Sequence, residues 1–143
     1  MQVDFYQLTR DPAEKVLPAI AQRVLDGGGR LVIVASDNAQ LEVISSSLWT
    51  AKADSFLAHA RSGEGDDAVQ PILLSTEVNA SNGARFVAIA DGIWRPVENL
   101  FDRAFYLFPP DQTDNARAAW RGLDKQTDRH YWKQDGGKWV QGP

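Results

Sequence analysis

The sequence predicts a single-domain, three-layer α/β fold over residues 1–143, with a mixed sheet that carries helices on both faces. Short apolar segments rich in β-branched and aromatic residues alternate with longer segments whose apolar residues recur at helical spacing. This alternation is typical of sheets built from strands and crossover helices. The chain has 143 residues, 43% hydrophobic and 24% charged, which is the size and composition of one globular domain.

The first predicted elements are a strand and a helix near the N-terminus. Residues 3–8 are rich in Val, Phe and Tyr and predict a strand. Apolar residues at helical spacing predict a helix over about residues 13–26. Asp11 can cap its free amides, Pro12 suits the first helical position, and Glu14 can complete a capping box.

A second strand and helix follow directly. The continuous apolar run at residues 31–35 predicts a central strand covered on both faces, because it has no polar side. A helix is expected over residues 37–49, capped by Ser36 or Asp37. The order strand, helix, strand, helix implies a right-handed crossover and parallel strands.

The second half of the chain predicts shorter elements. Strands are expected at residues 72–74, 85–90 and 104–108. Loops or turns are expected at residues 62–68, 79–83 and 91–100, the last with one helical turn. The final helix is expected at residues 111–127, and residues 130–132 and 138–140 are expected to form a hairpin around Asp135-Gly136-Gly137.

Composition restricts the class of protein. Cys is absent and only His59 and His130 are present, which argues against a disulfide scaffold and a zinc site. The net charge of −4 and pI of about 5.1 are the opposite of the basic surface of a direct DNA binder, so contact with DNA is expected to be indirect. No signal peptide or membrane span is recognised, and a cytoplasmic protein is expected.

No motif for catalysis or cofactor binding is recognised. The glycines at residues 27–29 follow a predicted helix and precede a strand, the reverse of a nucleotide-binding loop. Residues 63–65 lack the Lys-Ser/Thr of a phosphate loop, and Asp66-Asp67 lack a third metal ligand. Ser45-Ser46-Ser47 lacks the glycine frame of a nucleophile elbow. We therefore expect no catalytic residue, metal or cofactor.

The last predicted helix carries a row of basic residues in an acidic protein. Arg117, Arg121, Lys125 and Arg129 are four residues apart and would share one side of a helix for as long as it continues. Trp120 lies beside them. A guanidinium group can bind a carboxylate through two parallel hydrogen bonds, and Trp120 offers an apolar surface beside it. An acidic peptide that ends in a hydrophobic residue is therefore one natural ligand. The alternative is a solvated charged face, compensated by neighbouring aspartates.

A second candidate surface lies where the second helix ends. Leu48-Trp49 and Ser55-Phe56-Leu57 bring large apolar residues to this point. They can close the core or form an interface, and the sequence alone leaves both open. If they form an interface, Trp49 and Phe56 are expected to lie close together and partly exposed.

Several segments together resemble the chi subunit family of bacterial DNA polymerase III, over nearly the whole chain from Val3 to about Trp139. Two of these segments are residues 4–8 and residues 31–37. The most specific is a combination of Leu48-Trp49, residues 55–59 and Gly63-Glu64-Gly65. The last are a strand that ends near Pro109 and the helical segment Ala116-Arg117-Ala118-Ala119-Trp120-Arg121. Residues 125–134 do not follow the family pattern.

The resemblance implies a Rossmann-like mixed sheet without nucleotide chemistry. It also implies a non-catalytic accessory subunit of the clamp-loader complex, bridging psi or another clamp-loader component to single-stranded-DNA-binding protein. The implied tail site is Arg117, Trp120 and Arg121, extended by Lys125, and its ligand is the acidic C-terminal tail of that protein, which ends in Phe. The implied psi-facing surface is Leu48, Trp49 and Phe56.

Two other classes of function are compatible with the fold. One is a small nucleotide-dependent enzyme on a Rossmann-like scaffold, against which the missing phosphate loop argues. The other is a direct nucleic-acid binder that uses the five Trp residues as stacking platforms, against which the acidic pI argues.

Overall fold

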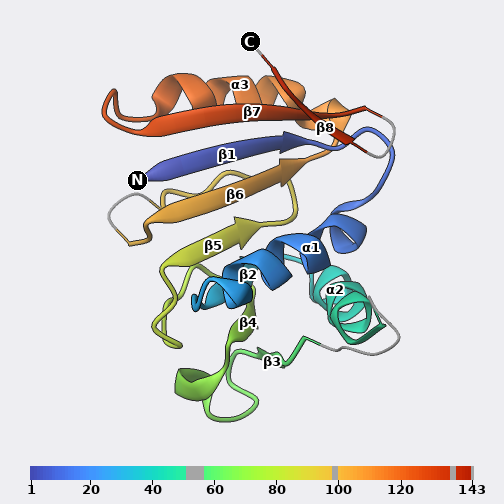
Figure 1. The fold of residues 1–143 in the computed structure, drawn as a ribbon, viewed down its shortest axis with the longest axis vertical. Helices are drawn as coiled ribbons and strands as arrows, with labels where there is room; N and C mark the ends of the chain where they lie inside the picture. The colour runs from blue at the N-terminus through green and yellow to red at the C-terminus, as the bar shows by residue number, and fades with distance from the viewer. Residues whose placement is uncertain (51–56, 98–99, 136–137, 143) are drawn as a thin grey trace.

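The computed structural model describes residues 1–50, 57–97, 100–135 and 138–142, and these form a mixed sheet with helices on both faces (Figure 1). The strands are β1 (Gln2–Gln7), β2 (Leu31–Val34), β3 (Ala60–Arg61), β4 (Ile72–Ser75), β5 (Phe86–Ile89), β6 (Arg103–Phe108), β7 (Asp128–Asp135) and β8 (Lys138–Gln141). The helices are α1 (Ala13–Asp26), α2 (Asn38–Thr50), α3 (Thr113–Gly122) and the short 3-10 turns η1 (Asp67–Val69) and η2 (Pro110–Gln112).

The described strands form one sheet of eight, in the order β3-β4-β2-β5-β6-β1-β7-β8. All neighbours are parallel except β7 and β8, which pair antiparallel as the predicted terminal hairpin. The chain returns to β1 twice, since β6 and β7 pair with its two edges. This arrangement brings the C-terminal part of the chain beside the N-terminus.

The sheet separates two hydrophobic cores. Successive residues of a strand point to opposite faces, so β1 contributes Val3 and Phe5 to one core and Tyr6 to the other. Helices α1 and α2 pack on the Tyr6 face, whereas α3 packs on the Phe5 face through Ala116 and Ala119. The predicted three-layer α/β fold is therefore confirmed.

Strand β2 is the apolar run that the sequence predicted as central. Its four residues are fully buried, and it lies between β4 and β5. Helix α2 follows as predicted, because the Asp37 carboxylate accepts the backbone N–H of Ala39 at 2.8 Å. A continuous apolar strand and a capped helix are local signals, and both were sufficient here.

The predicted capping of α1 was wrong in detail. Pro12 is the residue that precedes the helix, and no side chain caps the amides of α1. Asp11 instead accepts a hydrogen bond from Gln134 Nε2 at 2.9 Å. Gln134 Oε1 also accepts the backbone N–H groups of residues 9–11 at 3.0 to 3.3 Å. A buried amide from β7 thus holds the loop before α1.

Replacing Gln134 with Ala is expected to lower the free energy of unfolding by about 2 kcal/mol, because the buried Gln134 amide is lost and three backbone N–H groups lose their acceptor. Urea denaturation measures this difference. The exposed Gln126→Ala is the matched control, and its change is expected to stay within about 0.5 kcal/mol. Equal stability of the two variants would mean that water replaces the Gln134 amide at no cost.

Helix α3 is shorter than predicted, since it ends at Gly122 and not near residue 127. Leu123 is extended and buried, and the Asp124 carboxylate accepts the backbone N–H of Gln126 at 3.0 Å. The chain then enters β7, which pairs with β1. Lys125 and Arg129 therefore do not continue the basic row of the helix, and this part of the prediction was wrong.

Candidate functional site

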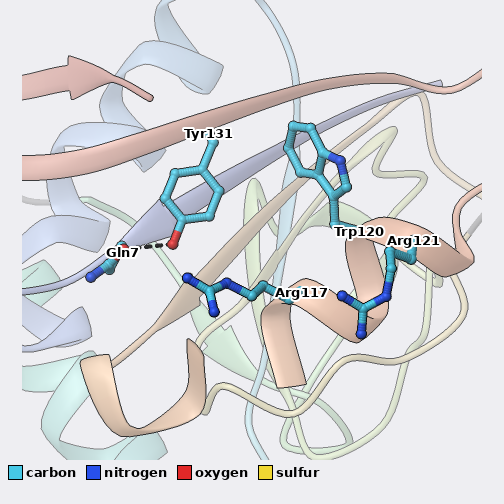
Figure 2. Close-up of a pocket in the computed structure, with 5 residues that line it drawn as sticks. All are labelled: Gln7, Arg117, Trp120, Arg121 and Tyr131. Atoms are coloured by element: carbon cyan, nitrogen blue, oxygen red, sulfur yellow. Dashed lines mark hydrogen bonds between the residues drawn. The ribbon is translucent and has the colours of Figure 1, made fainter. Parts of the chain in front are cut away.

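An open pocket of about 340 Å³ lies between α3 and the sheet face on which this helix packs. It is lined by Gln7 at the end of β1, by Arg117, Trp120 and Arg121 of α3, and by Tyr131 of β7 (Figure 2). Three segments that are far apart in the sequence therefore build one site. Figure 2 shows Arg117 extending from α3 toward Gln7 and Tyr131.

Helical spacing explains the contribution of α3. Ala116 and Ala119 are buried against the sheet, so Arg117 and Arg121 lie on an adjacent side of the helix, and both are exposed. Trp120 lies between the buried and exposed sides. The structure brings these three residues together around one pocket.

The apolar wall of the pocket is aromatic. The Trp120 ring packs edge-on against Phe5, with centroids 5.1 Å apart, and against Tyr131, with centroids 6.2 Å apart. Phe5 and Tyr131 also stack with centroids 6.4 Å apart. Such pairs hold rings in fixed orientations, and the half-buried Trp120 and Tyr131 leave part of their surfaces to a ligand.

The polar side of the pocket consists of the two guanidinium groups and a phenol. The Tyr131 hydroxyl donates to Gln7 Oε1 at 2.5 Å. Burial raises the pKa of Tyr131, and the nearby charge of Arg117 partly offsets this rise. Within the described residues, neither Arg117 nor Arg121 forms an ion pair or a side-chain hydrogen bond. Their donors are available to a carboxylate ligand.

Two residues of the predicted basic row lie elsewhere. Lys125 is exposed in the turn after α3 and does not line the pocket. Arg129 belongs to β7, and its guanidinium donates to the carbonyl oxygens of Trp120 at 2.5 Å and Asp124 at 2.7 Å. Sequence reasoning missed Gln7 and Tyr131, because only the pairing of β1 with β7 brings them to α3.

The second predicted surface is only partly supported by the geometry. Leu48 is fully buried in the core on which α2 packs, so it presents no surface of its own to a partner. Trp49 is 46% exposed, and its ring centroid lies 4.5 Å from that of His59. Phe56 lies outside the described residues, so its predicted closeness to Trp49 stays a prediction.

His59 holds this region in place. Its Nδ1 lies 2.7 Å from the carbonyl oxygen of Leu57, and its Nε2 lies 2.7 Å from Ser45 Oγ. Because a carbonyl only accepts, Nδ1 carries the proton in its contact with Leu57. The two contacts therefore tie α2 to the segment before β3.

The carboxyl ends of β2 and β5 form the edge at which open α/β sheets bind their ligands. Here Asp91 accepts the backbone N–H of Ser36 at 2.9 Å and both terminal nitrogens of Arg95 at 2.8 Å. Asp37 accepts a further N–H at the start of α2. The backbone N–H groups of Ser36 and Ala39, which could otherwise hold a phosphate at this edge, are thus bound to the protein's own carboxylates.

Burial alone would raise the pKa of Asp91, but hydrogen bonds from Arg95 and from the backbone N–H groups of Ser36 and Ile93 outweigh it and lower that pKa below 3.8. A carboxyl group whose pKa is lowered by folding stabilises the fold at pH values above its unfolded pKa. This contribution is lost as the pH falls through the lowered pKa of the folded state. Asp91→Asn is therefore expected to lower the free energy of unfolding at pH 7 by about 2 kcal/mol.

Urea denaturation at pH 7 and near pH 3 tests the role of Asp91. The difference between wild type and Asp91→Asn is expected to shrink at the lower pH, because the wild-type carboxyl begins to protonate there. A difference that is the same at both pH values would show that the Asp91 charge contributes nothing to stability.

Comparison with known proteins gives the family. The family model described as DNA polymerase III chi subunit, HolC, matches residues 1–131 of the 143-residue chain. The chain belongs to the DNA polymerase III chi subunit family. It is therefore an accessory subunit of the DNA polymerase III complex and belongs to DNA replication. The matched residues include the whole of the pocket between α3 and the sheet.

Comparison with a solved structure supports the fold, and the fold alone. The chi family chain superposes on the C-terminal domain of Dbp5 from S. cerevisiae, solved with Gle1 and IP6, with a TM-score of 0.53 and 14% identity, covering 92% of this chain and 90% of that chain. A C-terminal domain of a SWI2/SNF2 ATPase from Sulfolobus solfataricus gives a TM-score of 0.49 and 19% identity, covering 78% and 58%. No curated protein sequence matches the chain.

Two further features of the described residues bear on function. None of the helices there is long and apolar enough to cross a membrane. No group of three or more His, Asp or Glu side chains in the same part of the chain is arranged to hold a metal ion.

Proposed function

We propose that this chi family subunit binds the acidic C-terminal tail of single-stranded-DNA-binding protein in the pocket of Arg117, Trp120, Arg121, Tyr131 and Gln7. The tail supplies carboxylates and a terminal Phe. Through this contact the subunit links the clamp-loader assembly to single strands that are already coated with protein, and it contacts DNA only indirectly. It does so in the cytoplasm and performs no bond chemistry.

The observation that carries this proposal is the pairing of two unoccupied guanidinium groups with an aromatic wall. Arg117 and Arg121 present planar donors that match carboxylates, and charge-assisted hydrogen bonds of this kind are about twice as strong as neutral ones. Trp120 and Tyr131 offer an apolar surface in the same pocket. A ligand needs both acidic groups and an aromatic or aliphatic end to use all of these contacts.

Lys125 is proposed to extend the same site as an outer contact. It is exposed and follows α3 by three residues, so it lies beyond the lined pocket. A flexible ammonium at this distance attracts acidic residues upstream of the terminal Phe without a fixed hydrogen bond. Its contribution to affinity is therefore expected to be smaller than that of either arginine.

The surface around Trp49 is proposed as the contact for psi or another clamp-loader component, with Phe56 as its second aromatic residue. An exposed Trp at the end of a helix is typical of interface anchors. Leu48 contributes indirectly, because its buried side chain anchors α2 to the core and so fixes the helix that presents Trp49. The two surfaces lie on opposite faces of the sheet, so both partners can bind at once.

A nucleotide-dependent enzyme is the alternative, and the occupied amide donors beside Asp91 argue against it. Calorimetry with ATP and GTP tests this alternative directly, and micromolar affinity for either nucleotide would favour it over the adaptor.

The test of the proposed function uses the whole partner. The immobilised subunit is incubated with single-stranded-DNA-binding protein and with a form that lacks its acidic tail. Capture of the intact protein and loss of capture without the tail are expected. Equal capture of the two forms would place the contact outside the tail and remove the proposal.

A further inference from the structure

The strand after α3 contributes an arginine that does not face the pocket. Arg129 of β7 pairs in register with Val3 of β1, and Tyr131, two residues later, pairs with Phe5. Both backbone positions are thus fixed by the sheet. The Arg129 side chain reaches from this fixed strand to the C-terminal end of α3.

The contacts of Arg129 are directed at Trp120 and the helix end. Its two terminal nitrogens donate to the carbonyl oxygens of Trp120 and Asp124, at 2.5 and 2.7 Å. Its guanidinium carbon also lies 5.7 Å from the centroid of the Trp120 ring. These carbonyls also accept the backbone N–H groups of Leu123 and Thr127, at 3.5 and 3.0 Å, so Arg129 adds a charged donor to each. A cation at this end of a helix also opposes the negative end of the helix dipole.

We propose that Arg129 is a positioning residue, which holds Trp120 in the orientation that receives the hydrophobic end of the ligand. This inference rests on the proposed function. The pocket is lined by Trp120 but not by Arg129, whose described hydrogen bonds go to backbone carbonyls. Arg129 thus acts on the apolar side of the site, whereas Arg117 and Arg121 act on the acidic side.

The division of roles predicts a selective effect on ligand binding. Arg129→Met is expected to weaken the binding of an acidic peptide ending in Phe about fivefold, which corresponds to the loss of one cation–π contact and a less ordered indole. The same peptide ending in Ala is expected to lose less than about twofold, because it makes no use of Trp120. The salt dependence of affinity is expected to stay unchanged, since no charge that contacts the ligand is removed.

The experiment compares two peptides with four proteins, which are wild type, Arg129→Met, Arg129→Lys and Lys15→Met, by calorimetry at two salt concentrations. Arg129→Lys is included because it keeps the charge but cannot reach both carbonyls with planar donors, and partial recovery is expected. Lys15→Met is the charge-matched control, since Lys15 is exposed on α1 across the sheet from the pocket. An equal loss for both peptides with a weaker salt dependence would show that Arg129 contacts the ligand's carboxylates, which overturns the inference.

A measurement without ligand separates this inference from the proposed function. The protein labelled with 5-fluorotryptophan contains five fluorine probes, and the Trp120→Phe variant assigns the resonance of Trp120. Arg129→Met is expected to shift or broaden the Trp120 resonance and leave that of Trp49 in place. An unchanged Trp120 resonance overturns the positioning role. If wild type binds neither peptide, the proposed function fails together with the ligand-selective role inferred for Arg129.

Discussion

Charge reversal of Arg117 or Arg121 is expected to weaken binding of an acidic peptide ending in Phe at least tenfold. A charge-assisted hydrogen bond contributes about 1.5 to 3 kcal/mol, and about 1.4 kcal/mol corresponds to a factor of ten. Glu at either position also repels the ligand's carboxylates. Affinity of the wild type is expected to fall with added salt, because the groups involved are exposed.

Calorimetric titration of wild type, Arg117→Glu and Arg121→Glu measures this effect. Both variants should keep the circular dichroism spectrum of wild type, because neither arginine forms an ion pair within the described residues. Lys15→Glu reverses a charge on the other face of the sheet and is the control for net charge. Unchanged affinity in both folded variants would show that the two arginines do not bind the peptide and form only a solvated charged face.

Three of the five residues that line the candidate site could be predicted from the sequence, because helical spacing places them together. Arg117, Trp120 and Arg121 lie at positions that any helix over these residues would bring to one side. Gln7 and Tyr131 could not be predicted, since their contact joins residues 124 positions apart. Only the order of strands β6, β1 and β7 brings them together, and that order has no local signal.

The errors in the predicted elements have the same origin. The sequence correctly predicts strand β2 and helix α2, whose buried run and Asp37 cap are local features. Asp11 does not cap α1 as predicted, because its carboxylate accepts a hydrogen bond from Gln134, which lies more than 120 residues away in the sequence. Long-range partners therefore decided the points at which local propensity was wrong.

The end of α3 shows how strand pairing overrides helical pattern. Basic residues at intervals of four favour a helix through residue 127, yet Asp128 already pairs beside Gln2 of β1. The helix ends at Gly122, and the turn at Asp124 redirects the chain before β7 begins at Asp128. This change moved Arg129 from the ligand-facing row to the support of Trp120.

The second large effect is expected at the ion pair between β1 and β6. Asp4 is 1% exposed, and Arg103 reaches it with two nitrogens, at 2.7 and 2.6 Å. Gln2 adds a weaker contact at 3.2 Å. Because the Asp4 carboxylate is shielded from water, Arg103 is its main source of compensation, even though Arg103 itself is about one-third exposed.

Arg103→Met is therefore expected to lower the free energy of unfolding by about 3 kcal/mol at pH 7, because it leaves a buried charge without its partner. The double variant Asp4→Asn with Arg103→Met is expected to be more stable than Arg103→Met alone, since it removes the uncompensated charge.

Arg85→Met is the matched control. It breaks a similar pair with Asp102, but both of those side chains are more than half exposed, so a much smaller loss of stability than for Arg103→Met is expected. Urea denaturation of the four proteins measures all three differences. If Arg103→Met and Arg85→Met cost the same, burial of Asp4 does not govern the strength of its pair, and the argument from desolvation is wrong.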